Sequence, residues 1–191
     1  DRGGNVSSNH FNANKWVWKT TTHSPNGTLL DYQERYFDNA RNVTNTVDAL
    51  GHATSTAYDA AGRVTNTVDA LGRATQTLYD AAGRHLLTIH PDGTSVSNAY
   101  DNAGHLAGIT RLDAEGAVLD QTLYTRDPLG RVLTETDALG NVTSNSHDLA
   151  GRTIRTDHPD GSYSRTIYDT QGRAVAEMGP GMGADERKVL S

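Results

Sequence analysis

Short segments that mix β-branched, aromatic and polar residues follow one another through most of this chain, and none has the spacing of an apolar helix face. Residues 63–68 read Arg-Val-Thr-Asn-Thr-Val, and residues 73–79 read Arg-Ala-Thr-Gln-Thr-Leu-Tyr. Val, Thr and Tyr favour strands, because their side chains pack well on a pleated surface. Val64, Val68 and Leu78 give one moderately apolar face, and Thr residues make the opposite face polar. The pattern predicts short strands, two in each repeat and roughly a dozen or more in all.

Four-residue turn sequences separate these segments, and most end in a Gly, as in Asp69-Ala70-Leu71-Gly72. An Asp at the first position can accept a hydrogen bond from the backbone two residues on, and a closing Gly can adopt positive φ without a Cβ clash. Turns this short join antiparallel neighbours, so the predicted fold is an all-β antiparallel meander. In the regular parts the closing residues are alternately 10 and 11 positions apart. They are Arg41, Gly51, Gly62, Gly72, Gly83, Gly93, Gly104, Gly116, Gly130, Gly140, Gly151, Gly161 and Gly172.

Every second turn belongs to a six-residue motif, Tyr-Asp-x-x-Gly-Arg, that recurs with a period of 21 residues over much of the chain. A fixed period in this range indicates a repeat architecture. We treat the motif residues as the structural site of the chain. The copies are Tyr58, Asp59, Gly62 and Arg63; Tyr79, Asp80, Gly83 and Arg84; Tyr100, Asp101 and Gly104, with His105 last; and Tyr168, Asp169, Gly172 and Arg173. A weaker copy has His147 in place of Tyr, followed by Asp148, Gly151 and Arg152.

The odd period constrains how the strands pair. Side chains alternate between faces with period two, so one turn in each repeat must add an odd residue if every Tyr is to share a face. A bulged three-residue loop differs from a four-residue loop by one residue. If the turn from Asp69 is the three-residue kind, Asp69 pairs with Arg73. Arg63 then faces Tyr79 across a hairpin, a favourable cross-strand pair. The same rule pairs Arg84 with Tyr100, Arg152 with Tyr168, Arg131 with His147, and Thr67 with Thr75. Which turn of each repeat is bulged stays open.

Three regions are expected along the chain. Residues 1–35 form a less regular β segment with Trp16 and Trp18, which we expect to pack over an apolar edge. Residues 36–178 form the repeat sheet. Residues 179–191 read as a Gly-rich linker followed by a short charged tail with helical character. The chain begins at Asp1 within a turn-like stretch, and we expect it to be a fragment of a longer protein.

Strand length and composition favour a single layer over a compact domain. Strands this short make a ribbon only about 20 Å wide, which buries little against itself and must curl or meet another layer. Only 35% of the residues are hydrophobic. The expected form is a curved single-layer sheet, as in the wall of a hollow shell.

Charge and composition exclude several kinds of partner. The net charge is −6, which disfavours a nucleic-acid backbone. Cysteine is absent, which rules out disulfides and thiolate metal sites but is compatible with export. No apolar run approaches the ~20 residues that span a bilayer.

Residue types that often carry catalysis have structural explanations here. The acids mostly begin turns, where they accept backbone hydrogen bonds. His90 and His158 occupy equivalent turn positions before a Pro, and His52, His105 and His147 replace repeat residues, so we expect no metal ligands among them. We predict no catalytic residue, no cofactor and no metal site.

The Tyr-Asp-x-x-Gly-Arg repeat, alternating with Pro-Asp-Gly or Asp-Ala-Leu-Gly turns, resembles the YD-repeat or Rhs-repeat proteins. The resemblance covers about Tyr36 to Met178. It implies a very large bacterial protein whose β-sheet spirals into a hollow shell around a C-terminal toxin, as in polymorphic Rhs toxins and the C components of insecticidal Tc toxins. Family shells end in an Asp-Pro-containing sequence that cleaves itself. Asp127-Pro128 superficially matches that sequence, but it lies within the repeat frame without the Gly-rich continuation, so we interpret it as a plain turn.

The function expected from the sequence is therefore structural and non-catalytic: a segment of a YD-repeat shell that encloses a toxin or other cargo, secreted or displayed on a bacterial surface. The alternative is a cell-surface or fibre adhesin whose Tyr-lined sheet binds glycans. Expected partners are the remainder of the same polypeptide or identical chains through sheet edges, and an enclosed toxin domain. Glycans are partners only on the alternative, and neither nucleic acid nor a membrane span is expected.

Overall fold

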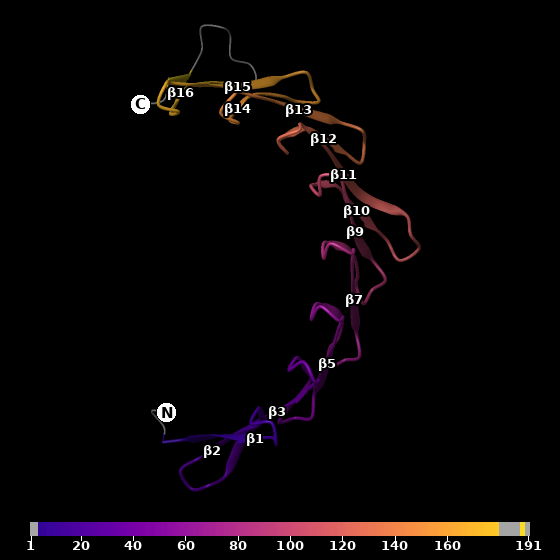
Figure 1. Cartoon of the computed structure of the whole chain (residues 1–191), viewed down its shortest axis with the longest axis vertical. Helices are drawn as coiled ribbons and strands as arrows, with labels where there is room; N and C mark the ends of the chain where they lie inside the picture. The colour runs from indigo at the N-terminus through magenta and orange to yellow at the C-terminus, as the bar shows by residue number, and fades with distance from the viewer. Residues whose placement is uncertain (1–3, 180–187, 190–191) are drawn as a thin grey trace. The chain divides into compact units, whose positions relative to one another are not determined.

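The computed structural model describes residues 4–179 and 188–189, and all of its regular structure is β (Figure 1). The chain divides into two compact units, residues 1–95 and 96–191. No helix among the described residues is long and apolar enough to cross a membrane.

The first unit is an antiparallel meander in which each strand pairs with the next along the chain. Its strands are β1 (Val6–Phe11), β2 (Val17–His23), β3 (Leu29–Phe37), β4 (Val43–Asp48), β5 (Ala53–Tyr58), β6 (Val64–Val68), β7 (Ala74–Tyr79) and β8 (His85–Ile89). Strand β9 (Ser95–Tyr100) crosses the boundary between the units. The segment before residue 36 contributes β1, β2 and most of β3, which pair in the same antiparallel way.

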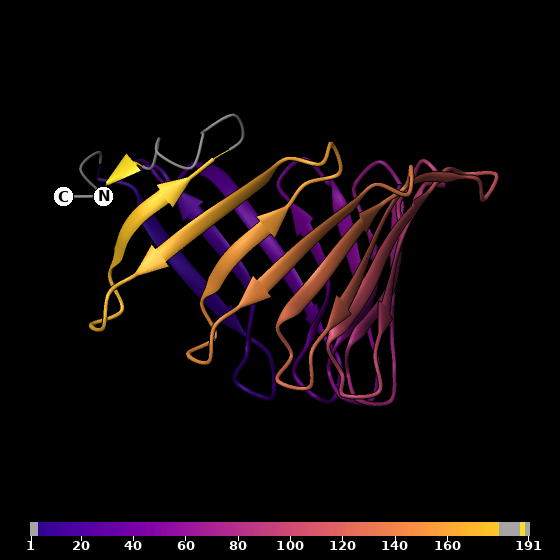
Figure 2. The ribbon, with the colours of Figure 1, turned by 90° about the horizontal axis from the view of Figure 1, so that it is seen from above.

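The second unit repeats this arrangement, and Figure 2 shows its orange and yellow strands side by side with hairpin turns at both ends. Its strands are β10 (Leu106–Leu112), β11 (Val118–Arg126), β12 (Val132–Asp137), β13 (Val142–His147), β14 (Thr153–Asp157), β15 (Tyr163–Tyr168), β16 (Ala174–Met178) and β17 (Lys188–Val189). The predicted all-β antiparallel meander is thus confirmed.

The charged tail does not have the predicted helical character where the structure describes it. Lys188–Val189 is a short strand that pairs with β16, because its backbone finds hydrogen-bond partners at that strand's edge. The rest of the tail and most of the Gly-rich linker, residues 180–187 and 190–191, lie outside the described residues.

Each unit is a single layer almost without a core. Every strand contacts only its neighbours in sequence among the described elements. Ala176 and Thr21, each 6% exposed, are the buried side chains, and no described side chain is less than 2% exposed. Stability must therefore come from hydrogen bonding between strands and from cross-strand pairs on the two faces.

The register explains how the odd period is absorbed. Across β6 and β7, Thr67 pairs with Thr75 without any shift, as predicted. Across β5 and β6, Tyr58 pairs with Val64 but Ala57 pairs with Asn66, so the second strand carries one extra residue. The same shift recurs between Leu78 and Tyr79 in the next repeat.

The expectation that the two turns of a repeat differ in loop length is therefore wrong. Both turns close with the same hydrogen bonds, as in Asp59 N to Arg63 O and Asp69 N to Arg73 O. The odd residue forms a β-bulge in the strand that follows each Tyr-Asp turn. A bulge interrupts the hydrogen bonding between the two strands at one position only.

Closing residues in the left-handed region hold the turns in shape. Gly62 has φ of 79° and Gly130 has φ of 82°, and Arg41 adopts φ of 73° without being a glycine. A Cβ built on Gly62 would meet nothing within 4 Å, whereas one on Gly130 would lie 2.8 Å from His105 Nε2.

We predict that Gly62→Ala lowers the free energy of unfolding by about 1–2 kcal/mol, the cost of left-handed backbone for an L-residue. Gly130→Ala should cost more, because the new methyl also displaces the His105 ring. Urea denaturation followed by circular dichroism measures both. Gly179→Ala is the control, since Gly179 has no positive φ and open space around its Cβ position. An equal loss of unfolding free energy in all three variants would contradict the role of left-handed backbone in these turns.

Candidate functional site

The Tyr-Asp turns follow β5, β7, β9 and β15, and the His147 variant follows β13, so within each unit they line one edge of the sheet. In an antiparallel meander alternate turns lie at the same edge, so the motif copies form a row there. The turns share two backbone hydrogen bonds: at the β5–β6 turn, Asp59 N donates to Arg63 O at 2.9 Å and Gly62 N to Asp59 O at 3.0 Å. The same pair closes each turn from β1–β2 to β15–β16. The motif's Asp and Gly thus occupy the first and last positions of these hydrogen-bonded turns.

The Asp carboxylate organises each motif turn from within. Asp59 Oδ1 accepts hydrogen bonds from the N–H of Ala61 at 2.9 Å and of Arg63 at 3.0 Å. Asp59 Oδ2 accepts from the Arg63 Nε at 2.7 Å. One side chain thus satisfies two backbone donors and anchors the Arg that follows the closing Gly.

This Asp–Arg ion pair recurs in the motif turns and was missed by the sequence analysis. It joins Asp80 to Arg84, Asp127 to Arg131, Asp148 to Arg152 and Asp169 to Arg173, and in the other kind of turn Asp69 to Arg73. His takes the place of Arg in the pairs Asp48–His52 and Asp101–His105, and Asn does so in Asp38–Asn42 and Asp137–Asn141. The available signal was the residue after the closing position, which in these turns always bears a nitrogen donor.

These contacts stabilise the ionised form of the turn carboxylates. Hydrogen bonding to the Arg63 N–H is the largest cause that lowers the pKa of Asp59, with the Arg63 side chain adding to it. For Asp148 the hydrogen bond from the Arg152 side chain is the largest cause of the lowered pKa. Partial desolvation opposes the shift in both.

The Arg of one hairpin lies over the Tyr of the facing strand, as predicted. The Arg63 guanidinium carbon lies 4.7 Å from the centre of the Tyr79 ring, and that of Arg152 lies 4.3 Å from the Tyr168 ring. Tyr168 donates its hydroxyl hydrogen bond to the Thr153 carbonyl at 3.2 Å. The two Tyr rings are therefore engaged in cross-strand packing.

An Arg that follows a closing Gly also reaches the next motif turn. Arg131 Nη1 donates to the carbonyl of Asp148 at 2.9 Å. A Cβ built on Gly172 would lie 3.1 Å from Arg152 Nη1, and one on Gly83 would lie 2.9 Å from Arg63 Nη1. Gly83 and Gly172 are thus favoured for two reasons: each has positive φ, and the Arg of the preceding motif turn lies where a Cβ would be.

His147 replaces the Tyr in one repeat, and its position shows what the ring contributes. The register between β12 and β13 continues to the position where His147 faces Arg131. The Nδ1 atom of His147 is buried and has no hydrogen-bond partner among the described residues. An unpaired buried polar atom costs stability that a Tyr ring would not.

The motif residues form a row and do not converge on one point. No group of three or more His, Asp or Glu among the described residues could hold a metal ion. Asp127 and Pro128 lie in a turn like the others, with Asp127 N bonded to Arg131 O at 3.0 Å and Gly130 N to Asp127 O at 2.9 Å. The interpretation of this dipeptide as a plain turn agrees with that geometry.

Acid should weaken the sheet. Because the folded-state pKa of each turn Asp lies below its unfolded value, the stabilisation is complete above the unfolded pKa of about 3.9 and is lost as pH falls through the folded value. We predict that the urea midpoint falls between about pH 4 and pH 2. Asp59→Asn keeps an acceptor but not the charge, so it should reduce this dependence, whereas Glu177→Gln, outside the turns, should leave it unchanged. A pH-independent midpoint would contradict the role of the carboxylates.

Exchanging the residues that face Arg131 and Arg152 tests the cross-strand pair. His147→Tyr should raise the free energy of unfolding by about 0.5–1 kcal/mol, because it adds a ring facing Arg131 and removes an unpaired nitrogen. Tyr168→His should lower it by a similar amount, since it removes the ring beneath Arg152. Denaturation of both variants measures the effects, and changes of the same sign would refute the pairing argument.

Comparisons with known proteins identify the repeat. A family model described as RHS Repeat matches residues 37–74, 58–95 and 100–142, which together make up more than half of the chain. A search of curated protein sequences found no match.

Solved structures resemble the fold at low sequence identity. The crystal structure of TcdB2-TccC3-Cdc42 matches with a TM-score of 0.66 and 15% identity, over 96% of this chain and 12% of that one. The Photorhabdus luminescens Tc holotoxin pore with the D651A mutation in TccC3 matches with a TM-score of 0.63 and 16% identity, over 91% of this chain and 11% of that one. The crystal structure of TcdB2-TccC3 itself matches with a TM-score of 0.63. The chain spans about an eighth or less of these molecules. The resemblance expected from the Tyr-Asp repeat is confirmed by the family match: the chain belongs to the RHS repeat family.

Proposed function

We propose that the chain is a structural, non-catalytic segment of a large secreted or surface-displayed bacterial protein, in which it forms part of the wall of a hollow β-shell that encloses a toxin or other cargo. The observation that carries this proposal is that the described residues have almost no core: each described strand touches only its sequence neighbours, and among the described side chains only those of Ala176 and Thr21 are buried. A sheet of this kind is suited to enclosing something else, because it buries so little of itself.

The family and the fold support the same conclusion. The chain is built of RHS repeats, and its fold resembles parts of structures described as a Tc holotoxin and as TcdB2-TccC3 complexes. Since it spans about an eighth or less of those molecules, its role is that of one stretch of wall. Neighbouring segments of the same polypeptide, or identical chains, are the partners that would pair with its edges.

The acidic side chains support a structural role in preference to catalysis. Turn carboxylates such as Asp59 and Asp148 are occupied by backbone N–H groups and by an Arg. They lie apart in a row, whereas acid–base catalysis needs two groups that converge on a substrate.

No observation favours the alternative of a glycan-binding adhesin. That hypothesis needs Tyr rings that are free to stack on sugars. The Tyr79 ring instead contacts the Arg63 guanidinium and meets the His85 ring edge to face, with ring centroids 5.7 Å apart. The Tyr58 hydroxyl donates to the Val43 carbonyl at 2.9 Å.

A labelling experiment on the two faces of β7 tests the shell. The chain has no cysteine, so Gln76→Cys and Thr77→Cys each add a single thiol, and the two side chains point to opposite faces because they are adjacent in one strand. In the isolated chain both should react with a bulky maleimide. In the longer parent protein, with native thiols removed, one position should become strongly protected and the other should stay reactive.

Equal reactivity of both positions in the parent protein would contradict enclosure. A small maleimide serves as the control for local burial, because it should reach both positions. Glycan-array binding that Tyr79→Ala abolishes while circular dichroism is unchanged would instead establish the adhesin hypothesis.

A further inference from the structure

Two residues adopt left-handed backbone without being glycine among the described part of the chain, and both are cationic. Lys15 has φ of 62° and Arg41 has φ of 73°. They close the β1–β2 and β3–β4 turns, with the same hydrogen bonds as the motif turns: Lys15 N to Asn12 O and Arg41 N to Asp38 O. In the turns from Gly51 onward a glycine occupies this position. Glycine would hold the backbone with less strain, so a side chain at these two positions indicates a role for the side chain itself.

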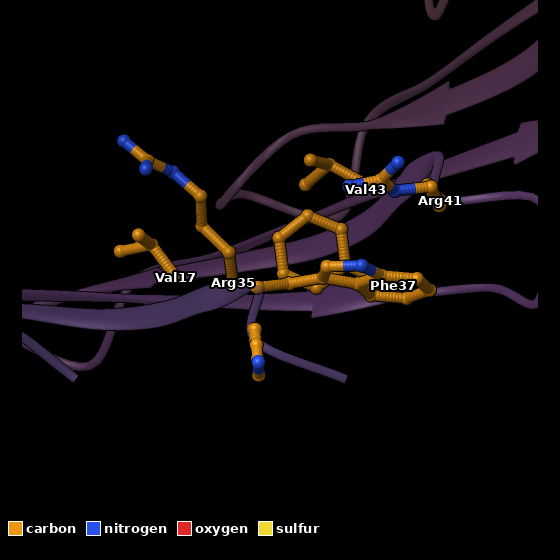
Figure 3. Close-up of a pocket in the computed structure, with 7 residues that line it drawn as sticks. Val17, Arg35, Phe37, Arg41 and Val43 are labelled. Atoms are coloured by element: carbon orange, nitrogen blue, oxygen red, sulfur yellow. The ribbon is translucent and has the colours of Figure 1, made fainter. Parts of the chain in front are cut away.

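Both residues line the same pocket. It is a shallow, open depression of about 530 Å³ bordered by Lys15, Trp16, Val17, Arg35, Phe37, Arg41 and Val43. Figure 3 shows Val17 and the Arg35 side chain at one end of the pocket and Val43 and Arg41 at the other end, with Phe37 between them. The pocket lies wholly within the first unit.

The floor of the pocket is aromatic. The Trp16 and Phe37 rings meet edge to face with centroids 5.4 Å apart, and the Arg41 guanidinium carbon lies 5.3 Å from the Trp16 ring. Trp16 follows Lys15 as Arg63 follows Gly62, so it occupies the position of the arginines that connect the motif turns. Here an apolar ring replaces the guanidinium at the edge of the sheet.

The charge of the pocket is opposite to that of the chain. The whole chain carries −6, but three cations and no carboxylate line this depression. Within the described residues none of Lys15, Arg35 and Arg41 forms an ion pair with an acid, whereas the turn arginines such as Arg63 and Arg152 do. Arg35 donates to the side chain of Gln33, a neutral group.

We propose that this pocket binds a flat organic anion, an aromatic carboxylate in its simplest form. The ring of the ligand would lie against Phe37 and Val43, and its oxyanion would accept hydrogen bonds from Arg41, which lies at the same end of the pocket as Val43. Charge-assisted hydrogen bonds beside an apolar surface supply both affinity and orientation. This site is independent of the shell function, because nothing in its chemistry depends on what the sheet encloses.

Arg41→Gly separates binding from folding. The substitution installs the residue that the other turns use at this φ, so stability should be unchanged or higher unless the contact with Trp16 dominates. Phenylacetate is the probe, and phenylacetamide is the matched neutral control. Their binding is followed by the NMR signal of the Trp16 indole N–H. The wild-type chain should bind phenylacetate saturably with a dissociation constant on the order of 1–10 mM, as expected for so small a ligand.

Arg41→Gly should weaken phenylacetate binding by at least about fivefold, and the double variant Lys15→Gly/Arg41→Gly should abolish it. Arg73→Gln removes a cation outside this pocket and should have no effect. Equal binding of phenylacetamide, an unchanged affinity in Arg41→Gly, or saturable binding of glucuronate in place of phenylacetate would each overturn the proposal. Loss of stability in Arg41→Gly without loss of affinity would show that Arg41 serves only to cover Trp16.

Discussion

The Asp-x-x-Gly turn is the constraint on which the rest of this structure depends. A carboxylate at its first position satisfies two backbone N–H groups, a glycine at its last position adopts φ near +80°, and the next side chain anchors to the same carboxylate. The turn thereby fixes the register of the hairpin, and a bulge beside each Tyr-Asp turn restores the face of the following Tyr. With register and face fixed, Arg63 and Arg152 meet Tyr rings across strands, and Arg131 reaches the next motif turn. Each turn thus helps to fix the position of the next turn along the edge of the sheet.

This way of specifying a sheet does not need a hydrophobic core. In most domains, burial of apolar surface is the dominant favourable term. Here many large apolar side chains are exposed, such as Leu71 and Leu139 at turn tips, which are 76% and 87% exposed, and the described strands have only one another as neighbours. Such a sheet can be extended by adding repeats, because each repeat brings its own register signal. The same property suits a wall, in which length matters more than compactness.

Much of this fold can be predicted from the sequence because its rules are local and repeated. The closing glycines predict the positive φ values, and the parity of the period, with Asp69 taken to pair with Arg73, places Arg63 opposite Tyr79. The position of the extra residue cannot be predicted, because a bulge in a strand and a longer loop give the same period. The Asp59–Arg63 pair was missed although its spacing is visible in the sequence, because turn formation and cross-strand packing already accounted for both residues.

Features that depend on segments distant in sequence could not be predicted. The strand at Lys188–Val189 has no periodic signal, because it depends on the edge of β16. Nor does the sequence reveal that Lys15 and Arg41 share a pocket, since they belong to different turns.

Sedimentation velocity of the chain over a range of concentrations tests most directly whether this sheet is a piece of wall. A single layer with an edge strand such as β1, which pairs with β2 and whose residues are all exposed, should associate through its edges or remain partly unfolded, so the sedimentation coefficient should rise with concentration. A compact, stable monomer whose sedimentation coefficient does not change with concentration would contradict the account.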